Sequence, residues 1–131
     1  MAKKGFLAHY SCCGNSIYKR STIFIDDNKL CSIDSFTCET ANTTFYDGLL
    51  LVVADTFHSH TDTFLTQVQD ALTQDSELSI TDAVLQNDTY NKHCAEINKE
   101  CHIYTLSPIQ WQALRPNTPQ NLKLELIYGL K

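Results

Sequence analysis

The chain has 131 residues, of which 43% are hydrophobic and 19% charged; this ordinary globular composition excludes collagen, a coiled coil and wholesale disorder. The length predicts a single domain over residues 1–131 and excludes a (β/α)₈ barrel, which needs about 250 residues. The formal net charge is −5, and the chain therefore lacks the basic excess typical of nucleic-acid binders, so we expect no nucleic-acid partner.

The first half of the chain has the pattern of β-strands. A short strand is expected over residues 5–11. Residues 17–25 are rich in β-branched and aromatic side chains and lead into a turn at residues 26–28. A second β run over residues 29–34, with Leu30, Cys31 and Ile33, makes this pair a predicted hairpin. Residues 49–54 are apolar without alternation, which predicts a strand buried on both faces.

The periodicity changes after His60. Apolar residues at helical spacing predict one helix over the region of residues 61–72, with Ser59 or Thr61 as its N-cap. A second helical pattern runs from Ile80 to Ile97, with Ser79 as its N-cap.

The last third returns to strands. Residues 101–106 are a candidate strand, and Pro108 is suited to the first turn of a small helix over residues 108–114. Residues 122–128 alternate apolar and charged side chains, as a half-exposed strand does. The order of elements predicts an α+β fold: a mainly antiparallel sheet or small sandwich, built from N-terminal strands plus a C-terminal strand, with two or three helices.

The chain contains no run of 18 apolar residues and no signal-peptide core, so we expect no membrane segment and a cytoplasmic location. In that compartment the six cysteines are expected to be reduced. Cys12 and Cys13 adjoin a turn and have no cationic neighbour in sequence, so a nucleophilic role is the lesser alternative to simple burial. Trp111 is expected to pack in the core, with an exposed anchor for a partner as the alternative.

Three features of the first half occur together: the hairpin over residues 21–34, the pair Asp47-Gly48 before the apolar run, and His58-Ser59-His60 after it. In these features the segment from Tyr10 to His60 resembles the start of amidohydrolase-superfamily enzymes, in the chlorohydrolase and nucleoside-deaminase branch. Those enzymes begin with a small β-sandwich, and their first barrel strand ends in a His-x-His pair.

The resemblance implies that His58 and His60 bind a divalent metal such as zinc. It also implies that residues 122–128 return to complete the sandwich by pairing with the N-terminal strands. The remaining metal ligands and the catalytic acid of the family lie on later barrel strands. The 71 residues after His60 are too few for such a barrel, so we do not expect the hydrolase mechanism to carry over.

The residues themselves leave the same question open. Two histidines at positions i and i+2 of an extended segment point the same way and could share a metal, or could be polar loop residues. His93-Cys94 and Cys101-His102 also carry zinc-ligand atoms, but their spacing is poor and Cys94 fits a helix core better.

We therefore expect a non-catalytic structural or interaction module related to the amidohydrolase sandwich, which associates with itself or with another protein through an exposed sheet edge. No catalytic residue and no cofactor are assigned. One alternative is a small metal-dependent, hydrolase-like enzyme that uses His58 and His60. The other is a small-molecule-binding domain unrelated to that family.

Overall fold

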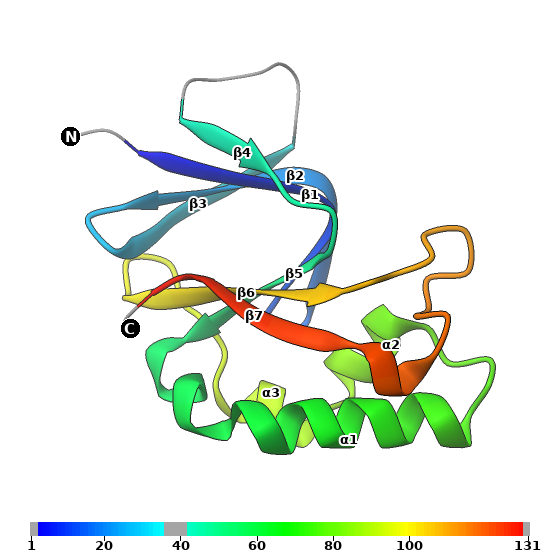
Figure 1. The fold of residues 1–131 in the computed structure, drawn as a ribbon. Helices are drawn as coiled ribbons and strands as arrows, with labels where there is room; N and C mark the ends of the chain where they lie inside the picture. Colours follow the sequence, from blue (N-terminus) through cyan, green and yellow to red (C-terminus); the bar gives the residue numbers. More distant parts are fainter. Residues whose placement is uncertain (1–2, 36–41, 130–131) are drawn as a thin grey trace.

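The computed structural model describes residues 3–35 and 42–129. These residues form an α+β fold in which α-helices cover one face of a mixed, open β-sheet (Figure 1). The strands are β1 (Lys4–Cys13), β2 (Ser16–Asp26), β3 (Lys29–Ser35), β4 (Thr43–Phe45), β5 (Leu49–Ala54), β6 (Cys101–Ser107) and β7 (Lys123–Tyr128). The helices are α1 (Thr61–Gln74), α2 (Ile80–Leu85) and α3 (Asp88–Lys92), with 3₁₀ turns η1 (Asp55–His60) and η2 (Pro119–Asn121).

The sheet has the strand order β3-β2-β1-β5-β6-β7, and β4 pairs with β1 beside this path. Its pairings are antiparallel except for those of β1 with β4 and with β5, which are parallel. Both parallel partners lie on the same side of β1: β4 pairs with Gly5–Leu7 and β5 with Tyr10–Cys13. The expected α+β fold with a mainly antiparallel sheet is confirmed.

The predicted hairpin is formed by β2 and β3. Its two turn residues, Asp27 and Asn28, both have positive φ, at 55° and 64°. This is the conformation of a tight hairpin turn whose twist matches that of the strands, and Asp and Asn adopt it at low cost. The local sequence therefore determines this turn.

The C-terminal strand joins the same sheet, but not where it was expected. β7 pairs with β6 at the edge opposite β3, and does not pair with the N-terminal strands. Its partner β6 is the strand that precedes it in the chain, and strands consecutive in sequence commonly pair.

The helical region differs from its prediction in two ways. The first helix spans Thr61–Gln74, but its N-cap is His60 and no side chain caps it, because η1 runs directly into α1. The second pattern forms two short helices, α2 and α3, instead of one. Ser79 caps α2 as predicted, and its hydroxyl accepts a hydrogen bond from the amide of Asp82 at 3.1 Å.

The helix expected over residues 108–114 is absent: this segment is a turn with a bridge between Gln110 and Arg115. Tertiary contacts hold it in this form. The indole nitrogen of Trp111 donates a hydrogen bond to Asp47 at 3.0 Å, and the Arg115 guanidinium donates to backbone carbonyls at and beyond the end of α1.

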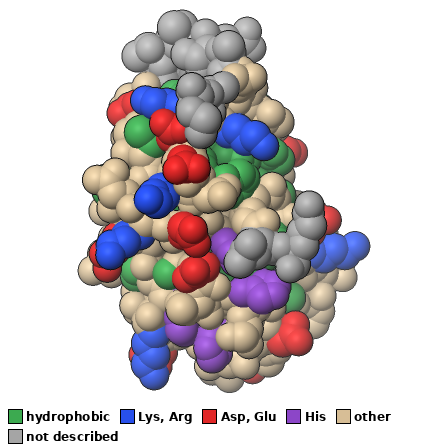
Figure 2. Space-filling view, turned by 90° about the vertical axis from the view of Figure 1, so that its left-hand side faces the viewer, with side chains coloured by type: hydrophobic (Ala, Val, Ile, Leu, Met, Phe, Trp, Pro, Cys, Tyr) green, Lys and Arg blue, Asp and Glu red, His purple; other side chains and the backbone are tan. Residues whose placement is uncertain are grey.

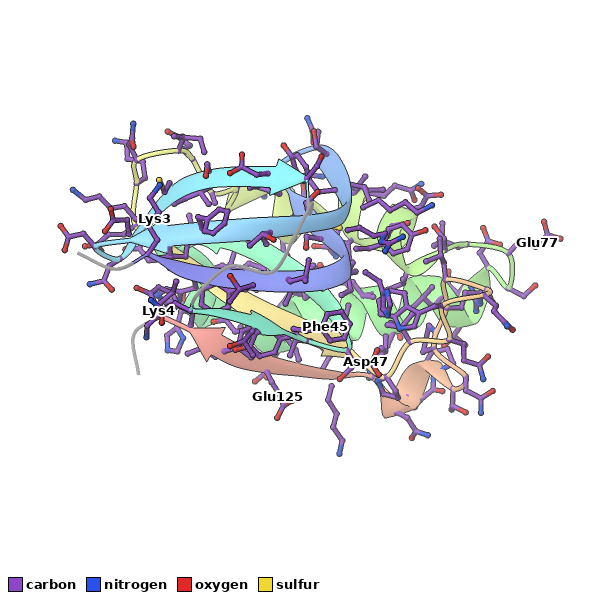
Figure 3. The ribbon with its side chains drawn as sticks, turned by 90° about the horizontal axis from the view of Figure 1, so that it is seen from above. Lys3, Lys4, Phe45, Asp47, Glu77 and Glu125 are labelled. Carbon is purple, nitrogen blue, oxygen red and sulfur yellow. The ribbon has the colours of Figure 1, made fainter. Side chains whose placement is uncertain are left out.

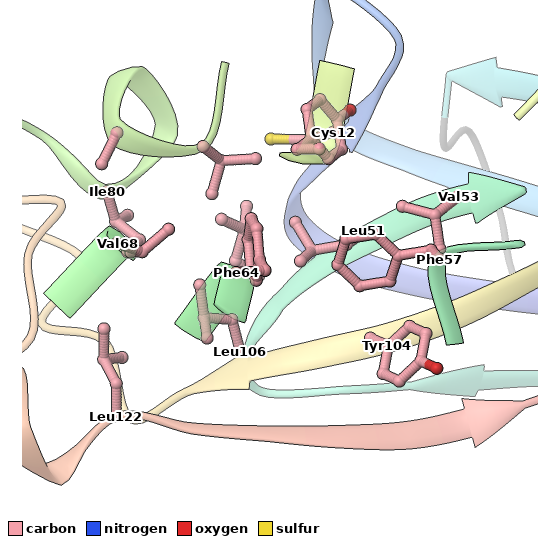
Figure 4. Packing of buried hydrophobic residues seen from close by; sticks show 14 of the residues in the cluster. Cys12, Leu51, Val53, Phe57, Phe64, Val68, Ile80, Tyr104, Leu106 and Leu122 are labelled. Carbon is pink, nitrogen blue, oxygen red and sulfur yellow. The ribbon is translucent and has the colours of Figure 1, made fainter. Parts of the chain in front are cut away.

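Each face of the sheet buries its own hydrophobic core, and β5 supplies both. Leu49, Leu51 and Val53 face the helices, whereas Leu50 and Val52 face the other side. The prediction that this strand is buried on both faces is confirmed. Phe57, Phe64, Val68, Ile80, Tyr104 and Leu106 complete much of the first core, which lies between the sheet and α1 (Figure 4).

The second core forms because the sheet curls. In the pairing of β1 with β2, His9 and Arg20 are skipped, and Arg20 has a φ of 52°. The register is the same on both sides of this gap; a bulge lies instead in the pairing of β2 with β3, next to Phe24, and bulges bend paired strands. β2 and β3 thereby curve over the face opposite the helices, where Ile23 and Leu30 pack with Ile103. In Figure 1 this upper part of the sheet arches above β5, β6 and β7.

Candidate functional site

His58 and His60 lie on η1, which follows β5 directly. The expectation that these two histidines lie on an extended segment is therefore wrong. In a 3₁₀ helix there are about three residues per turn, so side chains at i and i+2 diverge by about 120° instead of pointing the same way. Phe57, between them and the strand, is fully buried in the first core, while both imidazoles are exposed.

Each of these histidines has a different histidine neighbour. The ring of His58 lies 6.0 Å from that of His102, and its Nδ1 is 3.4 Å from the Tyr104 hydroxyl. The ring of His60 stacks on that of His93 at 4.6 Å, and His93 Nδ1 is 2.8 Å from the Thr56 hydroxyl. Figure 2 shows histidine side chains gathered at one end of the molecule. The structure thus forms two histidine pairs in place of one His58/His60 site.

Neither pair has the ligands of a structural zinc site, which normally has four. Within residues 3–35 and 42–129, no group of three or more His, Cys, Asp or Glu side chains is arranged to hold a metal ion. Burial, and then the neighbouring histidine, lower the pKa of His93 and of His102, which favours neutral imidazoles. Metal binding by His58 and His60 stays a prediction.

The other chemically reactive candidates are the cysteines. Burial raises the pKa of the Cys12 thiol to about 12 and that of Cys13 to about 11. Burial likewise raises the pKa of Cys101 to about 12. Because the thiolate is the nucleophile, these groups are held in their unreactive form at neutral pH.

Trp111 is half-buried against the first core and stacks on Tyr10, with ring centroids 5.8 Å apart. The ring of His9 lies between Trp111 and Phe45, at 5.0 Å and 5.2 Å. Phe45 is 51% exposed. Trp111 is therefore partly a core residue, as expected, and partly a member of an aromatic surface cluster.

The exposed edge of the sheet at β7 is the feature most suited to recognition. Among the described strands, β7 pairs only with β6, so its other edge is open to a further strand. Along it, Lys123 and Glu125 are exposed and Leu124 and Leu126 are half-buried against the first core. Glu125 extends away from the molecule in the view from above (Figure 3). The alternation that predicted the strand also predicted these exposures.

A groove that sequence reasoning missed lies beside the other end of β7. It has two adjoining hollows of about 300 Å³ and 450 Å³, which share Lys4, Ile127 and Tyr128. Phe6 and Tyr46 line the larger hollow, and His102 and Glu100 line the smaller one. These residues come from distant parts of the chain, and no local pattern relates them.

Comparison with protein-family models, with curated proteins and with solved structures gives no significant match for this chain. Over the described residues, none of the helices combines the length and the hydrophobicity that crossing a membrane requires.

Proposed function

We propose that the chain is a non-catalytic interaction module that associates with a second copy of itself by pairing the exposed edges of two β7 strands. One observation carries the proposal: the open edge of β7 is complementary in charge to itself. The likeness of the N-terminal half to the amidohydrolase sandwich remains part of this proposal, as does the cytoplasmic location.

The complementarity follows from antiparallel geometry. In a symmetric antiparallel pair centred on Leu124, the Leu124 residues of the two copies lie opposite each other. Lys123 of each copy then lies opposite Glu125 of the other, which gives two such pairs. Directly opposite residues share a face of the sheet and lie about 5 Å apart at Cβ, close enough for an ion pair. Leu122 faces Leu126 in the same arrangement.

The neighbouring registers are disfavoured. Moving the symmetry centre by one residue places either Glu125 opposite Glu125 or Lys123 opposite Lys123. Like charges directly opposite each other destabilise a strand pair. Charged side chains on an edge normally discourage pairing; here their alternating sign selects one register.

Charge exchange gives the decisive experiment, with sedimentation velocity over a range of concentrations as the measurement. The wild-type protein is expected to dimerise with modest affinity, because two short strands bury less than the roughly 1,200 Å² of a typical stable interface. The variants Lys123→Glu and Glu125→Lys should each be monomeric, since each repels its own copy. An equimolar mixture of the two should form a heterodimer, and the double exchange should restore the homodimer.

Lys99→Glu and Glu77→Lys are matched controls: they change the net charge equally at exposed positions away from β7, and they should dimerise as the wild type does. The proposal fails if the wild type is monomeric throughout. It also fails if the mixture of the two β7 variants stays monomeric, or if the controls abolish association.

A further inference from the structure

We propose that the groove between β1, β4 and the C-terminal end of β7 is a binding site for a planar aromatic anion such as an aromatic carboxylate. This site is separate from the proposed pairing edge. The pairing uses residues 122–126, whereas the groove is lined by Ile127 and Tyr128 of the same strand.

The groove exists because the curled sheet does not close. β4 is only three residues long and covers β1 from Gly5 to Leu7. β7 ends near this place without pairing with β4, and the larger hollow of about 450 Å³ lies between them. Gly5 allows this geometry: a Cβ at that position would collide with the hydroxyl of Thr43, so a larger residue would force β4 away.

Three aromatic rings from different strands and loops meet in the groove. Phe6, which is 4% exposed, stacks on Tyr46 with ring centroids 6.0 Å apart and planes at 21°. Phe6 also meets Tyr128 edge to face, with ring centroids 5.5 Å apart. Tyr46 and Tyr128 are half-buried, so their rings remain accessible beside a buried Phe6. Aromatic rings prefer such stacked and edge-to-face neighbours, so a flat aromatic guest would extend the cluster.

The charge of the larger hollow favours an anion. Of the nine described residues that line the larger hollow, Lys4 is the one with a charged side chain. Its ammonium lies 5.7 Å from the centre of the Tyr128 ring, at the rim of the aromatic cluster. Figure 3 shows Lys4 beside the C-terminal end of β7. Asn42 and Thr44 add hydrogen-bonding groups to the same hollow.

Glu100 lines the adjoining smaller hollow. A carboxylate bound there would be repelled, so the anionic group is expected in the larger hollow, which Lys4 lines without Glu100. Small-molecule sites typically have largely apolar and aromatic walls and a small number of convergent polar groups.

The test is an NMR titration of ¹⁵N-labelled full chain with three probes of one ring system: naphthoate, neutral naphthalenemethanol and cationic naphthylmethylammonium. Naphthoate is expected to bind most tightly and to shift the amides of residues 4–6, 44–46 and 127–128. Lys4→Met should weaken naphthoate binding by about fivefold, the effect of one partly solvated charge, and leave naphthalenemethanol unchanged.

Lys19→Met is the matched control, because its ammonium lies over the ring of Tyr10, away from the groove. It should leave all affinities unchanged. Tyr46→Ser should weaken both naphthoate and naphthalenemethanol, with Tyr18→Ser as its control and the amides of α1 as the check on folding.

Three outcomes would overturn the assignment: naphthoate causes no saturable shift, its shifts lie elsewhere (for example around Trp111), or Lys4→Met and Lys19→Met affect it equally. Monomeric β7 charge variants should bind naphthoate as the wild type does, so this result and the self-association result are independent.

Discussion

The hydroxyl of Tyr90 in α3 donates a hydrogen bond to the carbonyl oxygen of Gly14, 2.9 Å away in the turn between β1 and β2. The Tyr90 side chain is fully buried in the first core. Its burial also raises the pKa of the phenol, which therefore stays protonated as a donor. One tyrosine thus fastens the helical layer to a turn of the sheet 76 residues earlier in the chain.

Replacing Tyr90 by Phe keeps the ring and removes this bond. We expect Tyr90→Phe to lower the free energy of unfolding by about 1–2 kcal/mol, because the Gly14 carbonyl loses its partner near the core. Urea unfolding followed by circular dichroism measures the loss. Tyr18→Phe, at a half-buried position on β2, should cost much less, and equal losses in the two variants would contradict the role of the bond.

Arg115 is the second position where one side chain holds separate segments together. Its guanidinium donates to the carbonyls of Leu72 at 2.8 Å and Asp75 at 3.0 Å, and also to that of Leu78. These carbonyls lie in the last turn of α1 and just beyond it, where a positive charge is favourable. We expect Arg115→Met to cost about 2–3 kcal/mol, the scale of charged hydrogen bonds at a half-buried site.

The substitution Arg115→Lys distinguishes the contribution of the positive charge from that of the guanidinium geometry. Arg115→Lys retains the charge but lacks the planar fork that reaches three carbonyls, so it should recover only part of the loss in the same urea experiment. Full recovery with lysine would show that the charge alone matters.

The protein should lose stability on mild acidification. His102 is 3% exposed, and burial together with His58 lowers its pKa below the ordinary 6.5, although Asp55 and Glu100 oppose the shift. The unfolded chain therefore binds the proton more readily. Stability conferred by neutral His102 is present above about pH 6.5 and declines as the pH falls below that value. His93, whose pKa is also lowered, adds to this effect.

Urea midpoints measured between about pH 7.5 and about pH 5.5 test this dependence. The decline should be smaller in His102→Gln, whose side chain cannot titrate, and unchanged in His9→Gln, in the middle of β1, where the ring contacts Phe45 and Trp111 instead of His102. A midpoint that rises on acidification would contradict the direction of the shift.

The metal prediction has a direct test. Because the described His58 and His60 side chains diverge and each meets one further imidazole, we expect untagged protein to contain no stoichiometric zinc. Elemental analysis of protein purified with zinc present measures this. Stoichiometric zinc that is lost in both His58→Ala and His60→Ala would contradict the expectation and restore the metal-dependent enzyme as the leading alternative.

The features that could be predicted from the sequence are those set by neighbours in the chain. The Asp27-Asn28 turn and the alternation around Leu124 each act within a few residues, and both were predicted correctly. The segment around Trp111 shows where such reasoning ends. Pro108 favours a helix locally, but the bonds of Trp111 to Asp47 and of Arg115 to the end of α1 outweigh that preference.

The candidate sites likewise differ in whether the local sequence could predict them. The self-complementary edge is contained in the alternation of residues 122–126, so the sequence located its charges, although not the partner strand β6. The His58/His60 geometry depended on a 3₁₀ turn that spacing alone does not reveal. The groove brings Phe6, Tyr46 and Tyr128 together across the whole chain, and only the curl of the sheet relates them.

The five buried residues of β5, Leu49 to Val53, are all aliphatic, although alternate ones face different cores. A slip of this strand by one residue would consequently exchange the two sets without exposing a polar group. The orientation of β5 must then be imposed by its neighbours. On β6, Cys101 and Ile103 face one core while Tyr104 and Leu106 face the other, and Tyr104 packs on the side with the helices. The sequence of β5 alone therefore does not determine the register of this strand.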